Sequence, residues 1–109
     1  MKEIKAIIRS ERLANVLVAL HAMPELPGVT ISTVRGFGRM MSAHEHDTTF
    51  DEVTMTKLEI VVPGAIADDV AGAIERAAHT GQAGDGKIFI IPVEQAIRIR
   101  SGERERAEG

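Results

Sequence analysis

The chain has no cysteine, tryptophan or tyrosine, and these absences exclude several classes of function. Without cysteine there is no disulfide, no thiolate nucleophile and no cysteine-based metal site. With only three phenylalanines, stacking of nucleic-acid bases on aromatic side chains is disfavoured. Neither sign of charge dominates, because 13 basic and 16 acidic residues give a net charge of −3, so direct nucleic-acid binding is not expected. No apolar run reaches the roughly 18 residues of a membrane helix, and we expect a cytoplasmic protein without membrane insertion.

The 109 residues are expected to form one domain, 1–109. Apolar alternation and helical periodicity predict strands over 2–9, 29–34, 54–62 and 88–93, and helices over about 10–23 and 66–77. Ser10 is the predicted N-cap of the first helix. The segment from Met40 to about Val53 (40–53) is polar and unperiodic, which predicts a long exposed loop, and the charged tail 101–109 is expected to be frayed.

The element order β-α-β-β-α-β predicts an α+β, ferredoxin-like fold: an antiparallel sheet with both helices on one face. Alternate apolar residues of the first and third strands should face the helices: Ile4, Ala6, Ile8, Leu58, Ile60 and Val62. The opposite face, which carries Thr30, Ser32, Glu59 and Val61, would have no cover from this chain. A small domain with half its sheet uncovered is predicted to form a homo-oligomer.

The stretch from Thr80 to Arg100 carries the strongest candidate site. It opens with a glycine-rich turn, Lys87 follows as the chain enters an apolar run, and Arg98 and Arg100 alternate with isoleucines. If the last segment, 97–100, is a strand, both guanidinium groups lie on one face. Backbone N–H groups of a glycine loop, with a lysine and two arginines, suit a polyphosphate. An ordinary turn and a solvated edge strand would use the same residues, so residue types alone leave both interpretations open.

Several segments together resemble the PII signal-transduction proteins, a nitrogen regulatory family. They are Gly36-Phe37-Gly38-Arg39, Lys57 to Val62, Thr80-Gly81, Gly84 to Phe89, Pro92-Val93-Glu94-Gln95 and Ile97-Arg98-Ile99-Arg100. The resemblance covers nearly the whole chain. It implies a homotrimer that binds ATP, ADP or AMP between neighbouring subunits and is not an enzyme. It also implies that the long loop docks onto a transporter, an enzyme or a transcription regulator.

The resemblance further implies which residues bind the nucleotide. Four residues of the glycine-rich turn would hold phosphates: Gly84, Asp85, Gly86 and Lys87. The segment Arg98, Ile99 and Arg100 would reach the phosphates from across the cleft. Three residues at the loop base would lie against the nucleotide: Gly38, Arg39 and Met40. Thr30, Glu59 and Val61 would line the adenine side.

Departures from the family pattern concern its other ligand. Met40 stands where typical members have a glutamine that helps to hold Mg²⁺ and 2-oxoglutarate, and a thioether is a poor ligand for a hard cation. Met55 stands where they have a lysine that helps to hold the oxoacid. The loop is shorter, and the chain has no tyrosine to be modified. We therefore expect a divergent member that is not a standard 2-oxoglutarate sensor.

An alternative function follows from His44 and His46 in the long loop, with Met40, Met41 and Met55 near its ends. Imidazole and thioether donors suit copper, silver, zinc or nickel. The protein would then be a metal-responsive regulator, or a metal-binding module linked to metal transport. A polar loop that merely contains two histidines is the simpler interpretation. A small enzyme is a third, but no nucleophile–base pair stands out.

Overall fold

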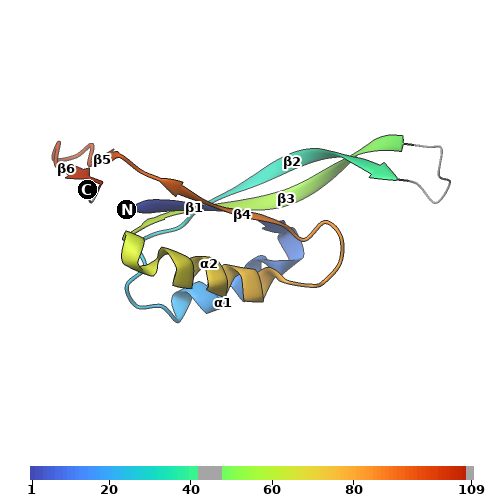
Figure 1. Ribbon diagram of the computed structural model, residues 1–109, viewed down its shortest axis with the longest axis horizontal. Coiled ribbons are helices and arrows are strands. Elements are labelled where there is room, and N and C mark those ends of the chain that lie inside the picture. The colour runs from blue at the N-terminus through green and yellow to red at the C-terminus, as the bar shows by residue number, and fades with distance from the viewer. Residues whose placement is uncertain (42–47, 108–109) are drawn as a thin grey trace.

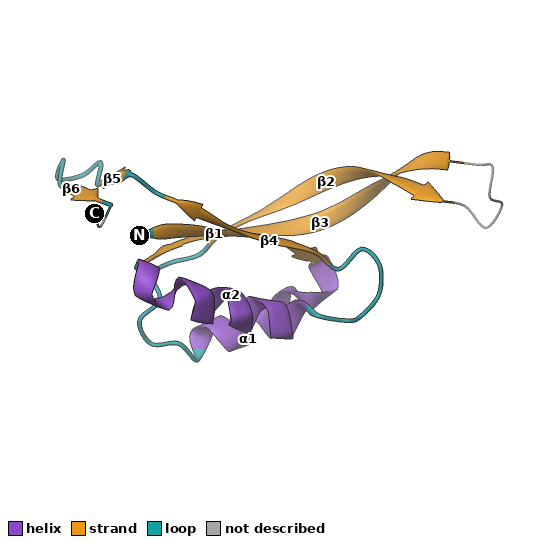
Figure 2. Cartoon of the chain, in the orientation of Figure 1, coloured by secondary structure: helices purple, strands orange, loops and turns teal. Residues whose placement is uncertain are grey.

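The computed structural model describes residues 1–41 and 48–107, with the backbone alone for 38–41 and 48–51. Two helices cover one face of a four-stranded antiparallel sheet (Figures 1 and 2). The elements are β1 (Lys2–Arg9), a 3-10 turn η1 (Ser10–Arg12), α1 (Leu13–His21), β2 (Thr30–Met41), β3 (Thr48–Val62), α2 (Gly64–Ala78), β4 (Gly86–Pro92), β5 (Gln95–Ile97) and β6 (Arg104–Arg106). The sheet order is β2-β3-β1-β4, so the predicted ferredoxin-like α+β class is confirmed.

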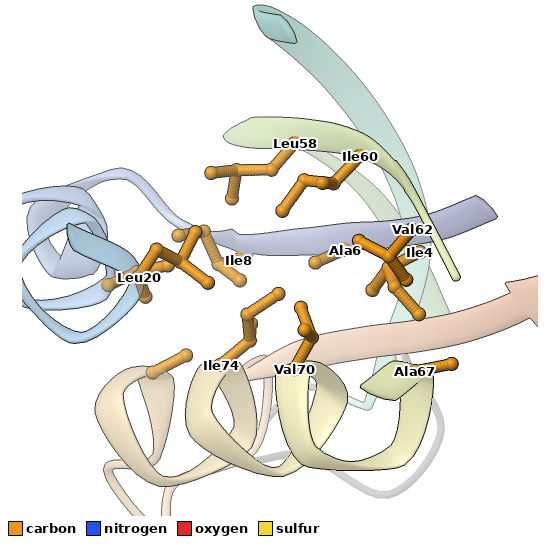
Figure 3. Packing of buried hydrophobic residues seen from close by; sticks show 12 residues of the cluster. Ile4, Ala6, Ile8, Leu20, Leu58, Ile60, Val62, Ala67, Val70 and Ile74 are labelled. Carbon is orange, nitrogen blue, oxygen red and sulfur yellow. The ribbon is translucent and has the colours of Figure 1, made fainter. Parts of the chain in front are cut away.

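The core lies between the sheet and the helices (Figure 3). The two central strands supply alternate side chains that are almost fully buried, as the sequence predicts: Ile4, Ala6 and Ile8 of β1, and Leu58, Ile60 and Val62 of β3. In α2 the buried residues recur at helical spacing: Ala67, Val70, Ile74 and Ala78. Each large aliphatic side chain stabilises the fold by about 1.5–3 kcal/mol when buried, so this layer holds the helices against the sheet.

The first helix begins later than predicted. Ser10 lies in the 3-10 turn and is not the N-cap of α1. Its hydroxyl accepts a hydrogen bond from the hydroxyl of Thr56 at 2.9 Å, which connects the turn to β3. The helix also ends at His21, before the predicted Met23. Pro24 stands three residues after His21 and cannot continue the helical hydrogen bonding.

The predicted loop over 40–53 is wrong for most of its length. β2 continues through Gly36 and Gly38, and it pairs with β3 up to Met41 opposite Thr48. Glycine has no side chain to pack, but it keeps the N–H and C=O groups that the strand pairing needs. Residues 42–47, which include the histidines of the predicted metal site, lie outside the described residues.

Part of the β2–β3 pair extends beyond the rest of the sheet (Figure 1). The pairing of β1 with β3 ends at Arg9 opposite Met55, so residues 35–41 and 48–54 pair only with each other. We call these residues the projecting ribbon. Its exposed side chains include Phe37, at 64% exposure, and Val53, at 44%. The described residues at its base, 35–37 and 52–54, are all exposed. A strand segment with neither face buried is not forced into apolar alternation, which explains the pattern there.

The predicted frayed tail is wrong for Arg104–Arg106, which form a strand, and the predicted strand over 97–100 is wrong after Ile97. β6 pairs antiparallel with β5, forming the C-terminal hairpin (residues 95–106). Between the strands the chain turns, with the N–H of Arg98 bonded to the carbonyl of Glu103 at 2.8 Å. Gly102, with φ of +74°, permits this reversal. Arg98 therefore follows β5 and Arg100 lies in the turn, so the two do not share a strand face.

The other face of the sheet has no helix over it among the described residues (Figure 2). It carries Val61 of β3, which is 42% exposed, and Phe89 of β4, which is 44% exposed. Phe89 points to this face because its neighbour Ile88 packs against the core. We call it the open face. No described helix is long and apolar enough to cross a membrane.

Candidate functional site

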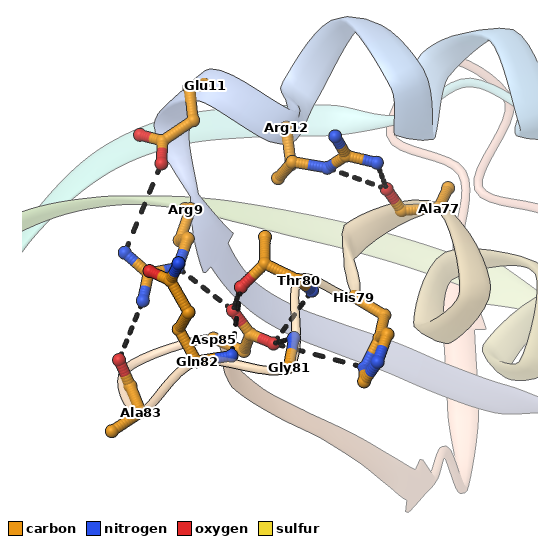
Figure 4. Close-up of polar contacts among 10 residues, drawn as sticks. All are labelled: Arg9, Glu11, Arg12, Ala77, His79, Thr80, Gly81, Gln82, Ala83 and Asp85. Atoms are coloured by element: carbon orange, nitrogen blue, oxygen red, sulfur yellow. Dashed lines mark hydrogen bonds and ion pairs between the residues drawn. The ribbon is translucent and has the colours of Figure 1, made fainter.

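The glycine-rich loop between α2 and β4, residues 79–86, is organised around the carboxylate of Asp85 (Figure 4). That carboxylate accepts hydrogen bonds from the backbone N–H groups of Thr80 and Gly81, each at 2.9 Å, and from the Thr80 hydroxyl. Arg9 Nε, at the end of β1, donates another at 2.9 Å. These donors, the Thr80 hydroxyl first, hold the pKa of Asp85 well below its usual range. Asp85 is therefore ionised at neutral pH.

This arrangement disfavours the predicted role of Asp85 as a phosphate ligand. Its carboxylate oxygens already accept hydrogen bonds within the loop, and a carboxylate repels phosphate. The backbone N–H groups of the loop are better suited to bind phosphate. None of the described residues accepts a hydrogen bond from the N–H groups of Ala83 and Gly84. Successive free N–H groups in a turn form an anion-binding concavity.

Glycine is required where the loop joins the sheet. Gly81, Gly84 and Gly86 have φ values of +87°, +94° and +101°, which strain any residue with a Cβ. At Gly86 a Cβ would lie 1.8 Å from the carbonyl oxygen of Ile7. The start of β4 can approach β1 this closely only with glycine at position 86.

Lys87 places a cation next to the loop on the open face. It pairs with Ile7 of β1, and its exposed side chain points away from the helices because Ile88 packs against the core. On the helix side, a groove of about 590 Å³ beside the loop is lined by Asp68 and Glu75 of α2 and also by Lys87. The two acidic residues disfavour an anion next to α2, so phosphate is better placed against Lys87 on the open face.

The predicted adenine-side residues lie together on the open face. Thr30 is directly opposite Glu59 in the β2–β3 pairing, and Val61 is two residues further along the same face of β3. A hydrogen bond between Glu59 and Glu3 lowers the pKa of Glu59 and raises that of Glu3. The Nζ of Lys57 lies 3.6 Å from Glu59 Oε1, which further favours an ionised Glu59.

The structure separates the predicted site residues into two groups. Gly86 is opposite Ile8 at one end of β1, whereas Val61 is opposite Glu3 near the other end. The interval from Glu3 to Ile8 corresponds to about 17 Å of strand, at roughly 3.3 Å per residue. The glycine loop and the C-terminal hairpin lie at opposite ends of the body formed by sheet and helices (Figure 1). One chain therefore does not bring the glycine loop and the predicted arginines together.

Each group has further members. Gly38, Arg39 and Met40 lie in the projecting ribbon, at the end of the molecule where the glycine loop lies (Figure 1); only their backbone is described. Arg98, Ile99 and Arg100 lie at the hairpin end. Arg98 Nε is 3.7 Å from Glu103 Oε2, and both side chains are more than 70% exposed. An ion pair so exposed is weak, so Arg98 remains available to a stronger anionic partner.

Sequence reasoning missed Arg9, which lies at the end of β1 and bonds to the glycine loop. Its guanidinium bonds both to Asp85 and to the carbonyl of Ala83, at 2.6 Å. Arg9 stands 76 positions before Asp85, at the end of an alternating strand, where a basic residue is ordinary. Only the antiparallel pairing of β1 with β4 brings the two side chains together.

Comparison with known proteins places this ferredoxin-like chain in a class of regulatory proteins. The family model of "Nitrogen regulatory protein P-II" matches residues 1–103. The P-II protein of Nostoc punctiforme is 46% identical over 108 residues, covering 95% of this chain and 96% of the relative. P-II 2 of Methanothermobacter thermautotrophicus is 46% identical over 107 residues, covering 94% and 92%. P-II of Azospirillum brasilense is 40% identical over 108 residues, covering 95% and 96%.

The chain belongs to the nitrogen regulatory protein P-II family, whose members are signal-transduction proteins rather than enzymes. The metal-responsive alternative receives no support from these comparisons. Among the side chains that the structure describes, those of residues 1–37 and 52–107, no three histidine, aspartate or glutamate side chains form a cluster. His44 and His46 lie outside that part of the chain, so their predicted role stays a prediction.

Proposed function

We propose that this P-II family protein binds an adenine nucleotide, ATP, ADP or AMP, between neighbouring subunits of a homotrimer. The glycine loop and Lys87 of one subunit hold the phosphates together with Arg98 and Arg100 of the next. Thr30, Glu59 and Val61 line the adenine side. The ribbon that ends near Met40 transmits nucleotide occupancy to a partner protein, a transporter, an enzyme or a transcription regulator.

The observation that carries this proposal is the separation of the two basic groups within one chain. Lys87 with the free N–H groups of the loop lies at one end, and the two arginines lie at the other. Neither group alone offers enough positive charge for a polyphosphate, which binds best to several converging donors. A second subunit would supply the arginines that complete the site around Lys87 and the loop, so we place the site between subunits.

The open face supports assembly. Val61 and Phe89 are large apolar side chains, each more than two-fifths exposed, on a sheet face that no described helix covers. Cyclic assembly would bury such a face and bring one subunit's hairpin toward the next subunit's loop. Ile99 is 99% exposed beside the arginines, and contact with a neighbouring subunit would bury it as well.

Signalling follows from where Arg39 lies. It stands at the base of the segment 42–47, in a ribbon held to the sheet only through β2–β3 pairing. A nucleotide that contacts Arg39 in one ribbon conformation favours that conformation and so changes the affinity for a partner. With methionine at positions 40 and 55, the protein does not sense 2-oxoglutarate in the usual way of the family.

Calorimetric titration with ATP, ADP and AMP tests the nucleotide part of the proposal. The unaltered protein should bind at least one of them, and Lys87→Ala and Arg98→Ala should each weaken binding by about tenfold or more, since charge-assisted hydrogen bonds contribute about 1.5–3 kcal/mol each. Arg76→Ala, an exposed arginine on α2, is the matched control and should bind normally. Equal affinities in all four proteins would refute the assigned site.

A further inference from the structure

We propose that Arg9 is a positioning residue of the nucleotide site, which holds the glycine loop in its phosphate-binding shape by bonding to Asp85 and Ala83. This inference rests on the proposed function, because it concerns the same site. Arg9 itself does not contact the ligand. It acts through the loop backbone, whose N–H groups and neighbouring Lys87 do.

The contacts of Arg9 show how it restrains the loop (Figure 4). Its Nε donates to Asp85 Oδ1 at 2.9 Å, and its Nη2 donates to the carbonyl of Ala83 at 2.6 Å. One rigid guanidinium thus fixes a side chain and a backbone group of the same turn. Glu11 is its only other acidic neighbour among the described residues, at the limiting distance of 4.0 Å. The strong contacts of Arg9 are therefore made with the loop.

The site of contact matters for phosphate binding. Arg9 fixes the carbonyl of Ala83, which belongs to the same peptide unit as the N–H of Gly84 and follows the N–H of Ala83. Because a peptide is planar, holding its carbonyl oxygen also sets the direction of the N–H of Gly84. A Cβ at Gly84 would lie 3.4 Å from Arg9 Nη2, so the guanidinium packs directly against this turn.

Arg9 also balances charge. The low pKa of Asp85 leaves a negative charge within the loop that is proposed to bind an anion. Arg9 pairs with that charge from the side of β1, and both side chains are only about one-quarter exposed, at 23% and 24%. Without Arg9, the unpaired carboxylate would repel phosphate, and the loop would lose the restraint on its turn.

The test compares ATP affinity in Arg9→Met with that in Arg12→Met. Arg12 is a matched control because its guanidinium also donates two hydrogen bonds, at 3.0 and 2.7 Å, to a backbone carbonyl, that of Ala77 in the last turn of α2, and none to the loop itself. Both variants should lower the thermal midpoint. Arg9→Met should weaken ATP binding by about tenfold, whereas Arg12→Met should leave it within about twofold.

A double variant separates positioning from direct contact. If Arg9 acts through Asp85, then Arg9→Met with Asp85→Asn should bind ATP no more weakly than the worse single variant, because both break one interaction. Arg9→Lys, which keeps the charge but cannot bond to both loop groups in the same fork, should recover only part of the affinity. If Arg9→Met fails to fold, Arg9→Lys replaces it in the comparison with Arg12→Met.

The outcomes distinguish this role from the function on which it rests. If the unaltered protein binds no adenine nucleotide, the proposed function fails and the role of Arg9 with it. If the unaltered protein binds ATP but Arg9→Met and Arg9→Lys bind equally well, only the role of Arg9 is refuted. Fully additive losses in the double variant would also refute it, because the effect of Arg9 on ATP binding would then not depend on its contact with Asp85.

Discussion

Gly86 is the most constrained residue of the glycine loop. A Cβ there meets the carbonyl oxygen of Ile7 at 1.8 Å, and φ is +101°. We expect Gly86→Ala to lower the free energy of unfolding by about 2 kcal/mol or more. Denaturant unfolding at fixed protein concentration measures this.

Gly28→Ala is the control for that substitution, because a Cβ at Gly28 meets no atom within 4 Å and its φ is not positive. Its unfolding free energy should change by no more than about 0.5 kcal/mol. Equal effects at the two glycines would mean that the close approach of β4 to β1 is not as described.

The low pKa of Asp85 predicts that the free energy of unfolding depends on pH. Its pKa is lower in the folded protein than in the unfolded chain, so it stabilises the fold above its unfolded pKa of about 3.9. That stabilisation is lost as the pH falls below about 4 toward the folded value. The difference in unfolding free energy between the unaltered protein and Asp85→Asn should therefore be constant near neutral pH and shrink below about pH 4. A difference that stays constant down to pH 3 would contradict this account.

At the scale of elements, a hydroxyl pair connects β3 to the turn before α1. Thr56 is 5% exposed and donates to Ser10 Oγ at 2.9 Å. Thr56→Val keeps the shape but removes the donor, and should cost about 1 kcal/mol in unfolding free energy. Thr33→Val makes the same change at the exposed residue paired with Thr56, and should be nearly neutral. If both variants unfold alike, the hydroxyl pair contributes nothing.

The elements also show what the sequence can predict and why it stops. β1 and β3 were predicted with the correct faces because each buries one face, which forces apolar alternation. The sequence of the projecting ribbon predicts a loop because the residues at its base, 35–37 and 52–54, are exposed on both faces and its glycines resemble breaks. The sequence does not reveal β6, because Arg104–Arg106 is short, charged and exposed, so only its pairing with β5 defines it.

The sequence predicts those parts of the candidate site whose residues are close together along the chain. A glycine-rich turn followed by Lys87 is visible in the residue order, and so is the arginine pair. The sequence wrongly placed Arg98 and Arg100 on one strand face, because the turn before Gly102 depends on pairing with a strand that it did not reveal. Arg9 had no local signal at all.

For the whole molecule, the open face predicts how the subunits assemble. Sedimentation velocity should show a trimer, and Phe89→Lys should dissociate it by placing a charge within the apolar surface that becomes buried. Val18→Lys is the control, because Val18 is 72% exposed on α1, in the layer on the other side of the sheet. A monomeric unaltered protein, or a trimer that persists in Phe89→Lys, would show that the open face does not mediate assembly.

The divided site also concerns the whole molecule, and subunit mixing tests it most directly. Lys87→Ala and Arg98→Ala should each weaken nucleotide binding by about tenfold or more on their own. The two variants are then unfolded together and refolded as an equal mixture. An interface is intact when the Arg98→Ala chain supplies Lys87 and the Lys87→Ala chain supplies Arg98. Random assembly of a cyclic trimer makes about one interface in four intact. Calorimetry should therefore recover about a quarter of the sites at unaltered affinity, whereas no recovery, in mixed trimers confirmed by mass, would contradict a site shared between subunits.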